Sequence, residues 1–330
     1  MSGNGKIELP LVTFALFAYN QAPFISEALD SALSQDYSPL EIVIIDDGST
    51  DGTAEIIHAK VAEYTGPHKV KISLKDTNKG LANSVNDAIY NLSSGDWIVF
   101  AAGDDTSSND RTSKVAALAL SNLTLTLIQC GVTRVDAAGH FLGELQAPVL
   151  TLEKSVQQSI LGAAAAYHRP SIASFPPIGE RVIREDVVLT TRALLMGSFG
   201  RLDNSLVQWR RHENNLSGRL GKGFFQRVAF SKGRFVEAHS VAISQQVSDL
   251  THKMMQRKIG IDDGLRLLLL FTGQIRKNCR SVDFFVALEN KESLNNYLFR
   301  HPLNSAFGFA FLLYIHSKER MYFAYHKLFK

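Results

Sequence analysis

Short apolar runs alternate with helical patterns from the start of the chain. Residues 12–18 and 42–45 are apolar runs, the second entirely β-branched, and each ends at a polar turn, which is typical of strands buried in a parallel sheet. Residues 24–35 carry apolar side chains at helical spacing, and a second helical pattern runs from residue 54 to about residue 64. This order of segments is typical of an α/β fold.

The same order continues through the next segments. Residues 70–74 and 97–100 have the pattern of strands, and residues 81–92 between them have an apolar helical face. We therefore predict a doubly wound, mixed but mostly parallel sheet with helices on both faces. Further along, we expect helices at 112–120, 156–167 and 185–195, and strands at 123–130 and 206–211.

The charge changes sign near residue 220. Residues 221–330 contain 17 Lys and Arg against 8 Asp and Glu, a net charge of +9, whereas residues 1–220 carry a net charge of −6. We therefore predict two domains: residues 1–220 hold the sheet, and residues 221–330 form a basic helical module rich in aromatic side chains.

The basic module suggests a partner. Basic, aromatic-rich helices can lie on an anionic membrane surface, and we expect such a peripheral contact here. A helical cap on the first domain and a dimer interface are the alternatives, because aromatic side chains at helical spacing also form cores. No nucleic-acid-binding motif accompanies the charge, so nucleic acid is not an expected partner.

Composition narrows the cellular location. The chain is 45% hydrophobic and 20% charged, as in globular proteins. Cys130 and Cys279 lie far apart in sequence, which indicates no disulfide framework and fits a reducing compartment. No apolar leader follows Met1, and the longest apolar stretches are too short to cross a bilayer. We expect a cytoplasmic protein, in peripheral contact with the inner membrane face.

Two predicted strands end in paired carboxylates. Asp46 and Asp47 follow one strand, and Asp104 and Asp105 follow another. In open α/β sheets ligands bind outside the carboxyl ends of the strands, where carboxylates can accept hydrogen bonds from a nucleoside or hold a divalent cation. The plainer interpretation is that both pairs belong to helix-capping turns, with Ser49 or Asp51 as a cap.

The first strand turn excludes two nucleotide-binding classes. No glycine occurs between Val12 and Asp47, so this turn can form neither the dinucleotide-binding fingerprint nor a P-loop. The sequence therefore argues against a dehydrogenase and against a P-loop NTPase.

A set of short motifs resembles one family. The motifs are Phe17-Ala18-Tyr19-Asn20, Asp46-Asp47-Gly48-Ser49-Thr50-Asp51, Asn78-Lys79-Gly80, Asn86, Gly95-Asp96-Trp97-Ile98, Asp104-Asp105, Glu185-Asp186 and Arg211-His212-Glu213-Asn214-Asn215-Leu216-Ser217. Each is weak alone, but together, over residues 10–218, they resemble the family 2 glycosyltransferases with the GT-A fold. The resemblance implies a nucleotide-diphosphate sugar as donor, with UDP as the expected nucleotide.

The resemblance also implies roles for the donor-binding residues. Asp47 would contact uracil, Asp104 the ribose, and Asp105 a Mn²⁺ or Mg²⁺ ion that bridges the phosphates. The remaining nucleotide-sugar-binding residues would be Tyr19, Asn20, Ser49, Lys79, Asn86, Arg211 and His212. Ala102 stands where many relatives have a further acid, so the metal should bind weakly until the phosphates supply the missing oxygens.

Glu185 and Asp186 are the candidates for the general base, with Asp186 favoured by the family pattern. A carboxylate must take the proton of the acceptor hydroxyl, and a single base without a nucleophile implies inversion at the anomeric carbon. By analogy the acceptor is a lipid-linked glycan in bacterial surface polysaccharide synthesis. The alternatives are two acids placed in a first helical turn by the macrodipole, a sugar-nucleotide pyrophosphorylase, and a non-catalytic nucleotide-binding scaffold.

Overall fold

The computed structural model describes residues 9–152, 160–213, 215, 241–256, 259–260, 263–264, 267–268 and 270–271. The chain divides into two compact units, Met1–Gln246 and Val247–Lys330. The boundary expected at residue 220, and nearly all of the basic, aromatic-rich module, lie outside the described residues. The elements below belong to the first unit.

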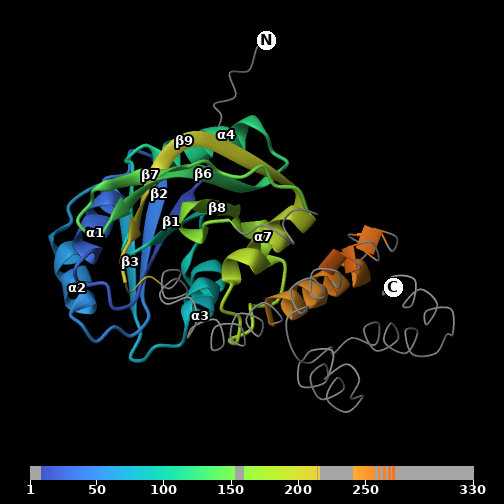
Figure 1. Ribbon diagram of the computed structural model, residues 1–330, viewed down its shortest axis with the longest axis horizontal. Coiled ribbons are helices and arrows are strands. Elements are labelled where there is room, and N and C mark those ends of the chain that lie inside the picture. The colour runs from blue at the N-terminus through green and yellow to red at the C-terminus, as the bar shows by residue number, and fades with distance from the viewer. Residues whose placement is uncertain are drawn as a thin grey trace, which may run out of the picture. The chain divides into compact units, whose positions relative to one another are not determined.

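One nine-stranded sheet forms the centre of this unit (Figure 1). Its strand order is β3-β2-β1-β4-β8-β6-β9-β5, with β7 paired to β6. The strands are β1 (Val12–Ala18), β2 (Leu40–Asp46), β3 (Lys69–Leu74), β4 (Trp97–Ala102), β5 (Thr106–Ser107), β6 (Leu125–Asp136), β7 (Phe141–Leu145), β8 (Ala165–His168) and β9 (Ser198–Arg211). Strands β3, β2, β1 and β4 are parallel, and β6 and β9 are parallel to each other. The mixed, mostly parallel sheet confirms the predicted fold class.

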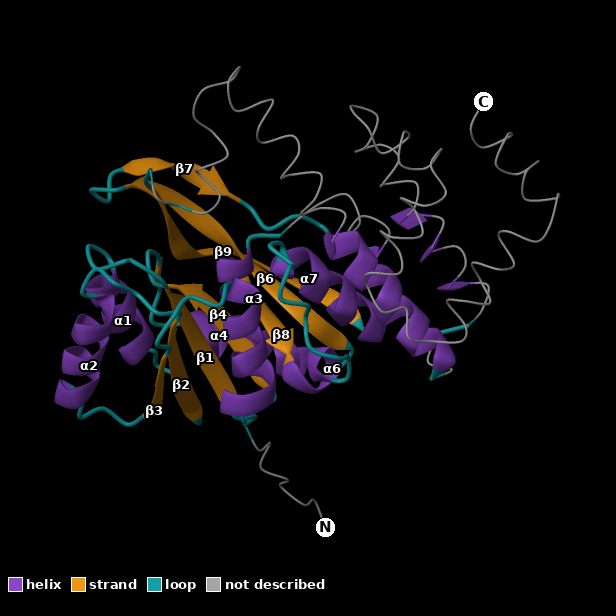
Figure 2. Cartoon of the chain, turned by 90° about the horizontal axis from the view of Figure 1, so that it is seen from below, coloured by secondary structure: helices purple, strands orange, loops and turns teal. Residues whose placement is uncertain are grey.

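Helices cover both faces of the sheet. They are α1 (Ile25–Leu33), α2 (Thr53–Glu63), α3 (Leu81–Asn86), α4 (Arg111–Ser121), α6 (Arg169–Ala173) and α7 (Glu185–Met196), with a π-helix η1 (Asp87–Leu92) and a 3₁₀ turn η2 (Gly162–Ala164). Figure 2 shows α1 and α2 on one side of β1, β2 and β3, and α3 on the other. No helix in the described part of the chain is long and apolar enough to span a membrane.

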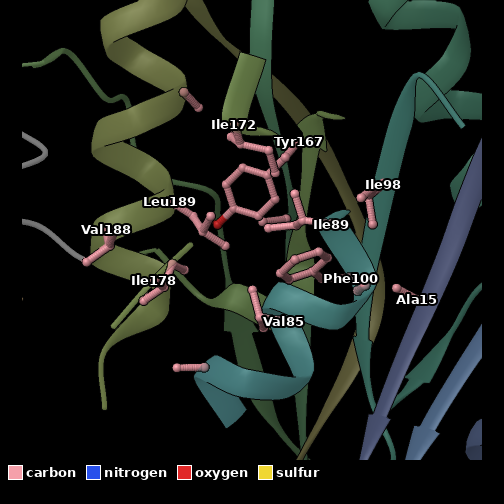
Figure 3. Close-up of a cluster of buried hydrophobic side chains, with 14 of the residues drawn as sticks. Ala15, Val85, Ile89, Ile98, Phe100, Tyr167, Ile172, Ile178, Val188 and Leu189 are labelled. Carbon is pink, nitrogen blue, oxygen red and sulfur yellow. The ribbon is translucent and has the colours of Figure 1, made fainter. Parts of the chain in front are cut away.

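Alternation along the strands produces two apolar layers. Phe14 and Leu16 of β1 face the layer under α1, α2 and α4, whereas Ala15 and Phe17 face the layer under α3 and α7. Figure 3 shows part of the second layer, where Tyr167 lies beside Leu189 of α7 and Phe100 lies beside Val85 of α3. Strands β1, β2 and β4 are buried on both faces, as their apolar runs predicted, whereas the edge strand β3 is only partly buried.

The helix expected at 156–167 is wrong where the structure describes it. Residues 165–168 form β8, which pairs antiparallel with β4 and β6, and residues 153–159 lie outside the described residues. Alanine favours helix in isolation, but Ala165 and Ala166 sit in the middle of the sheet, where pairing on both sides overrides that preference. The strand expected at 206–211 is longer, because β9 begins at Ser198.

Candidate active site

The carboxyl ends of β1, β2 and β4 meet at one edge of the sheet. Phe17 of β1 pairs with Ile45 of β2 and with Ala102 of β4, so the residues that follow these strands are brought side by side. Both pairs of aspartates therefore lie where an α/β sheet binds its ligand.

Hydrogen bonds join the loop after β1 to the loop after β2. The backbone N–H of Asn20 donates to Ser49 Oγ at 2.8 Å, and Asn20 Oδ1 accepts from Thr50 N at 2.9 Å. Asn20 has a φ of 51°, a conformation that asparagine tolerates better than most residues. Asn20 and Ser49 thus shape the loop edge, and the Tyr19 side chain beside them is 45% exposed.

The helix that follows β2 begins differently from the expected cap. Its N-cap position is Gly52, which has no side chain, and Asp51 Oδ1 accepts from Thr53 N at 3.1 Å instead. The Ser49 hydroxyl is engaged elsewhere, since its Oγ donates to Asp46 Oδ1 at 2.5 Å and accepts from the backbone N–H of Asn20 at 2.8 Å. Asp46 therefore closes its own turn, and its neighbour Asp47 is the acid of this pair that points to another segment.

Asp47 is buried and contacts the turn after β3. It accepts from the backbone N–H groups of Lys79 (3.2 Å) and Gly80 (2.8 Å) and from Ser84 Oγ (3.2 Å). Lys75 Nζ lies 3.2 Å from the same carboxylate. Asp47 thus holds the Asn78-Lys79-Gly80 turn against β2, while the Lys79 side chain is exposed at the surface.

Asp104 and Asp105 are also buried, at 8% and 5% exposure. Asp104 Oδ2 accepts from His212 Nε2 at 3.0 Å and from Asn215 Nδ2 at 2.9 Å, so the segment after β9 folds over the strand end. Asp105 Oδ1 accepts from the backbone N–H of Arg210 at 2.8 Å. Burial and the charge of Asp104 hold the pKa of Asp105 well above its usual range.

Arg210 is a buried residue of this site that the sequence motifs do not include. Arg210 is 5% exposed and its Nε donates to the backbone carbonyl of Asp104 at 3.2 Å, whereas Arg211 is partly exposed and lies over the Trp209 ring at 4.5 Å. Consecutive residues of a strand point to opposite faces. That alternation is the signal that could have separated the two arginines.

Glu185 and Asp186 open α7, as predicted. Burial raises the pKa of Glu185 to about 8, and the neighbouring charge of Asp186 adds to this. Burial also raises the pKa of Asp186, but the guanidinium of Arg184, whose Nε lies 4.0 Å from Asp186 Oδ1, opposes the rise. Of the two, Glu185 holds a proton near neutral pH and Asp186 is the better candidate for a carboxylate.

Asn86 contacts the segment that leads into α7. Its Nδ2 donates to the carbonyl of Ile178 and its Oδ1 accepts from the N–H of Ile178, both at 2.8 Å. Tyr90 Oη, one turn further along, donates to the carbonyl of Phe175 at 2.8 Å. The predicted ligand-binding residue Asn86 is therefore an anchor for the approach to Glu185 and Asp186.

The chemistry of the Asp104–Asp105 site fits a divalent cation. Two buried carboxylates sit together with His212, and a cation would offset the like charge that raises the pKa of Asp105. Among the residues that the structure describes, no three His, Cys, Asp or Glu side chains are grouped to hold a metal by themselves. The protein thus offers part of a coordination shell, and Asp105 would hold the ion.

Part of the chain matches a known protein family. Residues 13–147 match the family model described as Glycosyl transferase family 2. An uncharacterized glycosyltransferase of Haemophilus influenzae is 32% identical over 35% of this chain and 45% of its own length. The succinoglycan biosynthesis protein ExoO of Rhizobium meliloti is 30% identical over 47% of this chain and 44% of its own length. The matches thus span less than half of these relatives.

Solved structures show the same fold at lower identity. The structure of S. aureus TarS 1-349 in complex with UDP-GlcNAc has a TM-score of 0.52 and 18% identity, covering 80% of this chain and 81% of that one. This similarity shows that the two chains share a fold. The chain therefore carries a domain of glycosyl transferase family 2, with the GT-A fold expected from its motifs.

Proposed function

We propose that this protein is an inverting glycosyltransferase that moves a sugar from a UDP-linked donor to a hydroxyl acceptor. One observation carries the proposal: the buried Asp104–Asp105 pair at the carboxyl edge of the sheet, in a family 2 domain. Buried like charges are unfavourable unless a cation or ligand compensates them, so the pair is suited to a metal-bound diphosphate.

Residues of the two loops and of the β9 end would bind the donor. Asp47 and Asp104 offer carboxylate oxygens to the base and the ribose, beside Tyr19. Lys79, Arg211 and His212 are the candidates for the diphosphate, because Lys and Arg side chains pair with phosphate oxygens. Asn20, Ser49 and Asn86 would act by shaping the loops, through the hydrogen bonds described above.

Asp105 would hold a Mn²⁺ or Mg²⁺ ion at the diphosphate. Such an ion supplies positive charge that stabilises the leaving nucleoside diphosphate. Since the protein provides few ligands, we expect tight metal binding only when the nucleotide is present.

Asp186 would act as the base. The acceptor oxygen attacks the anomeric carbon while the bond between that carbon and the diphosphate oxygen breaks, and the hydroxyl proton passes to the Asp186 carboxylate. Glu185, with a pKa of about 8, keeps its proton at neutral pH and so avoids a second adjacent negative charge. Direct displacement by one base inverts the configuration of the sugar carbon.

The acceptor proposal rests on the relatives. ExoO is named for succinoglycan biosynthesis, and TarS was solved with UDP-GlcNAc. We infer a UDP-sugar as donor and, as acceptor, a lipid-linked glycan of bacterial surface polysaccharide synthesis. The basic residues 221–330 would then bring a cytoplasmic enzyme to the inner face of the membrane.

The test is release of UDP from a panel of UDP-sugars with Mn²⁺ or Mg²⁺, repeated with a chelator and with Asp105→Ala. We expect release from one donor that the chelator abolishes and that Asp105→Ala lowers at least ~100-fold, in line with loss of a metal ligand. Asp30→Ala, which removes an exposed aspartate paired with Lys60, is the matched control and should behave as wild type.

The other outcomes separate the alternatives. Release of inorganic diphosphate in place of UDP would identify a pyrophosphorylase. Calorimetric binding of UDP without turnover of any donor, with every acceptor tried, would identify a nucleotide-binding scaffold. Absence of UDP binding by the wild type, with and without metal, would reject the proposal.

A further inference from the structure

Arg210 contacts three segments around the Asp104–Asp105 pair. Its backbone N–H donates to Asp105 Oδ1 at 2.8 Å and its Nε donates to the carbonyl of Asp104 at 3.2 Å. Its Nη1 donates to the carbonyl of Ala137, in the turn between β6 and β7, at 3.0 Å. Its Nη2 lies 2.5 Å from Glu27 Oε2, in the first turn of α1. The side chain of one residue thus connects β9 with three other segments.

An aromatic ring closes this arrangement from the side of α1. The Arg210 guanidinium lies over the Phe24 ring at 5.1 Å, and the same ring contacts the His212 imidazole at 4.6 Å between centroids. His212 in turn reaches Asp104. The two aspartates, His212, Phe24 and Arg210 therefore form a closed circuit of contacts.

Because Arg210 is buried, the orientation of these contacts is fixed. Its side chain is 6% exposed, whereas that of its partner Glu27 is 62% exposed. A buried guanidinium presents its donors in a fixed plane, so the groups that accept from it are held in a fixed orientation. A lysine at the same position would carry the charge but could not reach the three acceptors in that plane.

We propose that Arg210 is a positioning residue that fixes the Asp104–Asp105 pair, through α1 and the β6–β7 turn, in the geometry that binds the metal–nucleotide complex. The inference rests on the proposed function, because it assigns how that same site is held. Arg210 itself is assigned no contact with the donor. Partners that orient metal ligands typically change metal affinity 10–100-fold when they are removed.

The experiment measures binding of Mn²⁺ to the full chain in the presence of UDP, by the electron paramagnetic resonance signal of free Mn²⁺. Arg210→Gln and Arg210→Lys are both expected to weaken Mn²⁺ binding at least ~10-fold. Glu27→Gln removes one of the partners and should weaken it less. In the double variant Arg210→Gln/Glu27→Gln the two effects should not add, because both act through one contact.

Arg201→Gln is the matched control. Arg201 lies on the same strand as Arg210, but it pairs with the exposed Asp203 and has a side chain that is 38% exposed. The control should bind Mn²⁺ and UDP as the wild type does. Thermal unfolding of every variant shows whether a loss of binding follows a loss of folded protein.

Each outcome decides the inference. If Arg210→Gln and Arg210→Lys are folded and bind Mn²⁺ with UDP like the wild type, Arg210 does not position the pair and the inference fails while the proposed function stands. Equal losses in Arg210→Gln and Arg201→Gln, or losses that follow the unfolding temperature alone, also reject it. A wild type that binds neither Mn²⁺ nor UDP removes the proposed function and this inference together.

Discussion

A single carboxyl group, Glu185, is expected to make stability depend on pH. Its pKa is about 8 in the folded chain against an ordinary 4.5. Between these values the folded state binds more protons than the unfolded state, so the free energy of unfolding falls as the pH rises from about 4.5 to about 8. Glu185→Gln cannot ionise, and it should raise the unfolding temperature at pH 8 by roughly 2–4 °C for each kcal/mol recovered.

Thermal unfolding of both proteins at pH 5 and pH 8 measures this effect. The difference in favour of Glu185→Gln should be small at pH 5 and larger at pH 8. Glu180→Gln, an exposed position just before α7, should show no such change. A pH-independent difference would mean that Glu185 is ionised throughout, and the assignment of its proton would be wrong.

At the residue scale, the sequence predicted the acids better than the groups around them. Asp104, Asp105, Glu185 and Asp186 were recognisable because acids at strand ends and helix starts form short motifs. Arg210 was not, since its importance depends on Glu27 and Ala137, which are 183 and 73 positions away. The role of Asn86 as an anchor likewise depends on Ile178, a contact across 92 positions.

At the scale of elements, the parallel half of the sheet is held together by Glu41 at the start of β2. Its carboxylate accepts from Thr13 Oγ1 of β1 at 2.6 Å, from Lys71 Nζ of β3 at 2.9 Å and from Ser94 Oγ before β4 at 2.7 Å. Burial alone would raise the pKa of Glu41, but hydrogen bonds from Ser94, Thr13 and Lys71 outweigh it and lower the pKa to about 2. Strands β1, β2 and β3 and the loop before β4 thus share one buried acceptor.

We predict that Glu41→Gln destabilises the chain by about 3 kcal/mol, because it removes the partner of Lys71 and leaves buried donors unpaired. The contribution of Glu41 is present above pH 4.5 and is lost as the pH falls toward about 2, since its pKa is lowered on folding. Denaturant unfolding at pH 7 measures the loss. Glu55→Gln, exposed on α2, should change stability by less than about 0.5 kcal/mol, and an equal loss there would contradict the role of Glu41.

The strands around Glu41 also show where pattern is sufficient for prediction and where it fails. Strands β1, β2 and β4 are mostly apolar and lie between turn residues, so the pattern of the sequence was sufficient to predict them as strands. Strand β8 is four residues long and contains two alanines, and its conformation follows from β4 and β6 on either side. A short segment of small residues carries little periodic signal, which is why the helix expected there is wrong.

At the scale of the whole molecule, the charge is divided by sequence position. Residues 1–220 carry a net charge of −6 and residues 221–330 a net charge of +9, so any attraction to an anionic surface should originate in the second segment. An acidic first segment can still bind a nucleotide, because a bound cation would neutralise negative charge on the phosphates. The proposed membrane contact is therefore an electrostatic one and should be screened by salt.

We predict that the full chain sediments with vesicles that contain anionic phosphatidylglycerol but not with neutral phosphatidylcholine vesicles. Salt at 0.5 M should reverse the binding, because the Debye length is then only roughly 4–5 Å. Replacing Arg320, Lys327 and Lys330 together by Gln should weaken binding by up to ~100-fold, since each basic residue near such a surface contributes about 1 kcal/mol.

The matched control replaces Lys60, Lys114 and Arg201 by Gln, three surface cations of the first unit. Equal weakening by both triple variants would show that net charge alone drives binding, and salt-independent sedimentation would show that apolar insertion does. Weakening by the first variant alone would place the membrane-binding surface in residues 221–330.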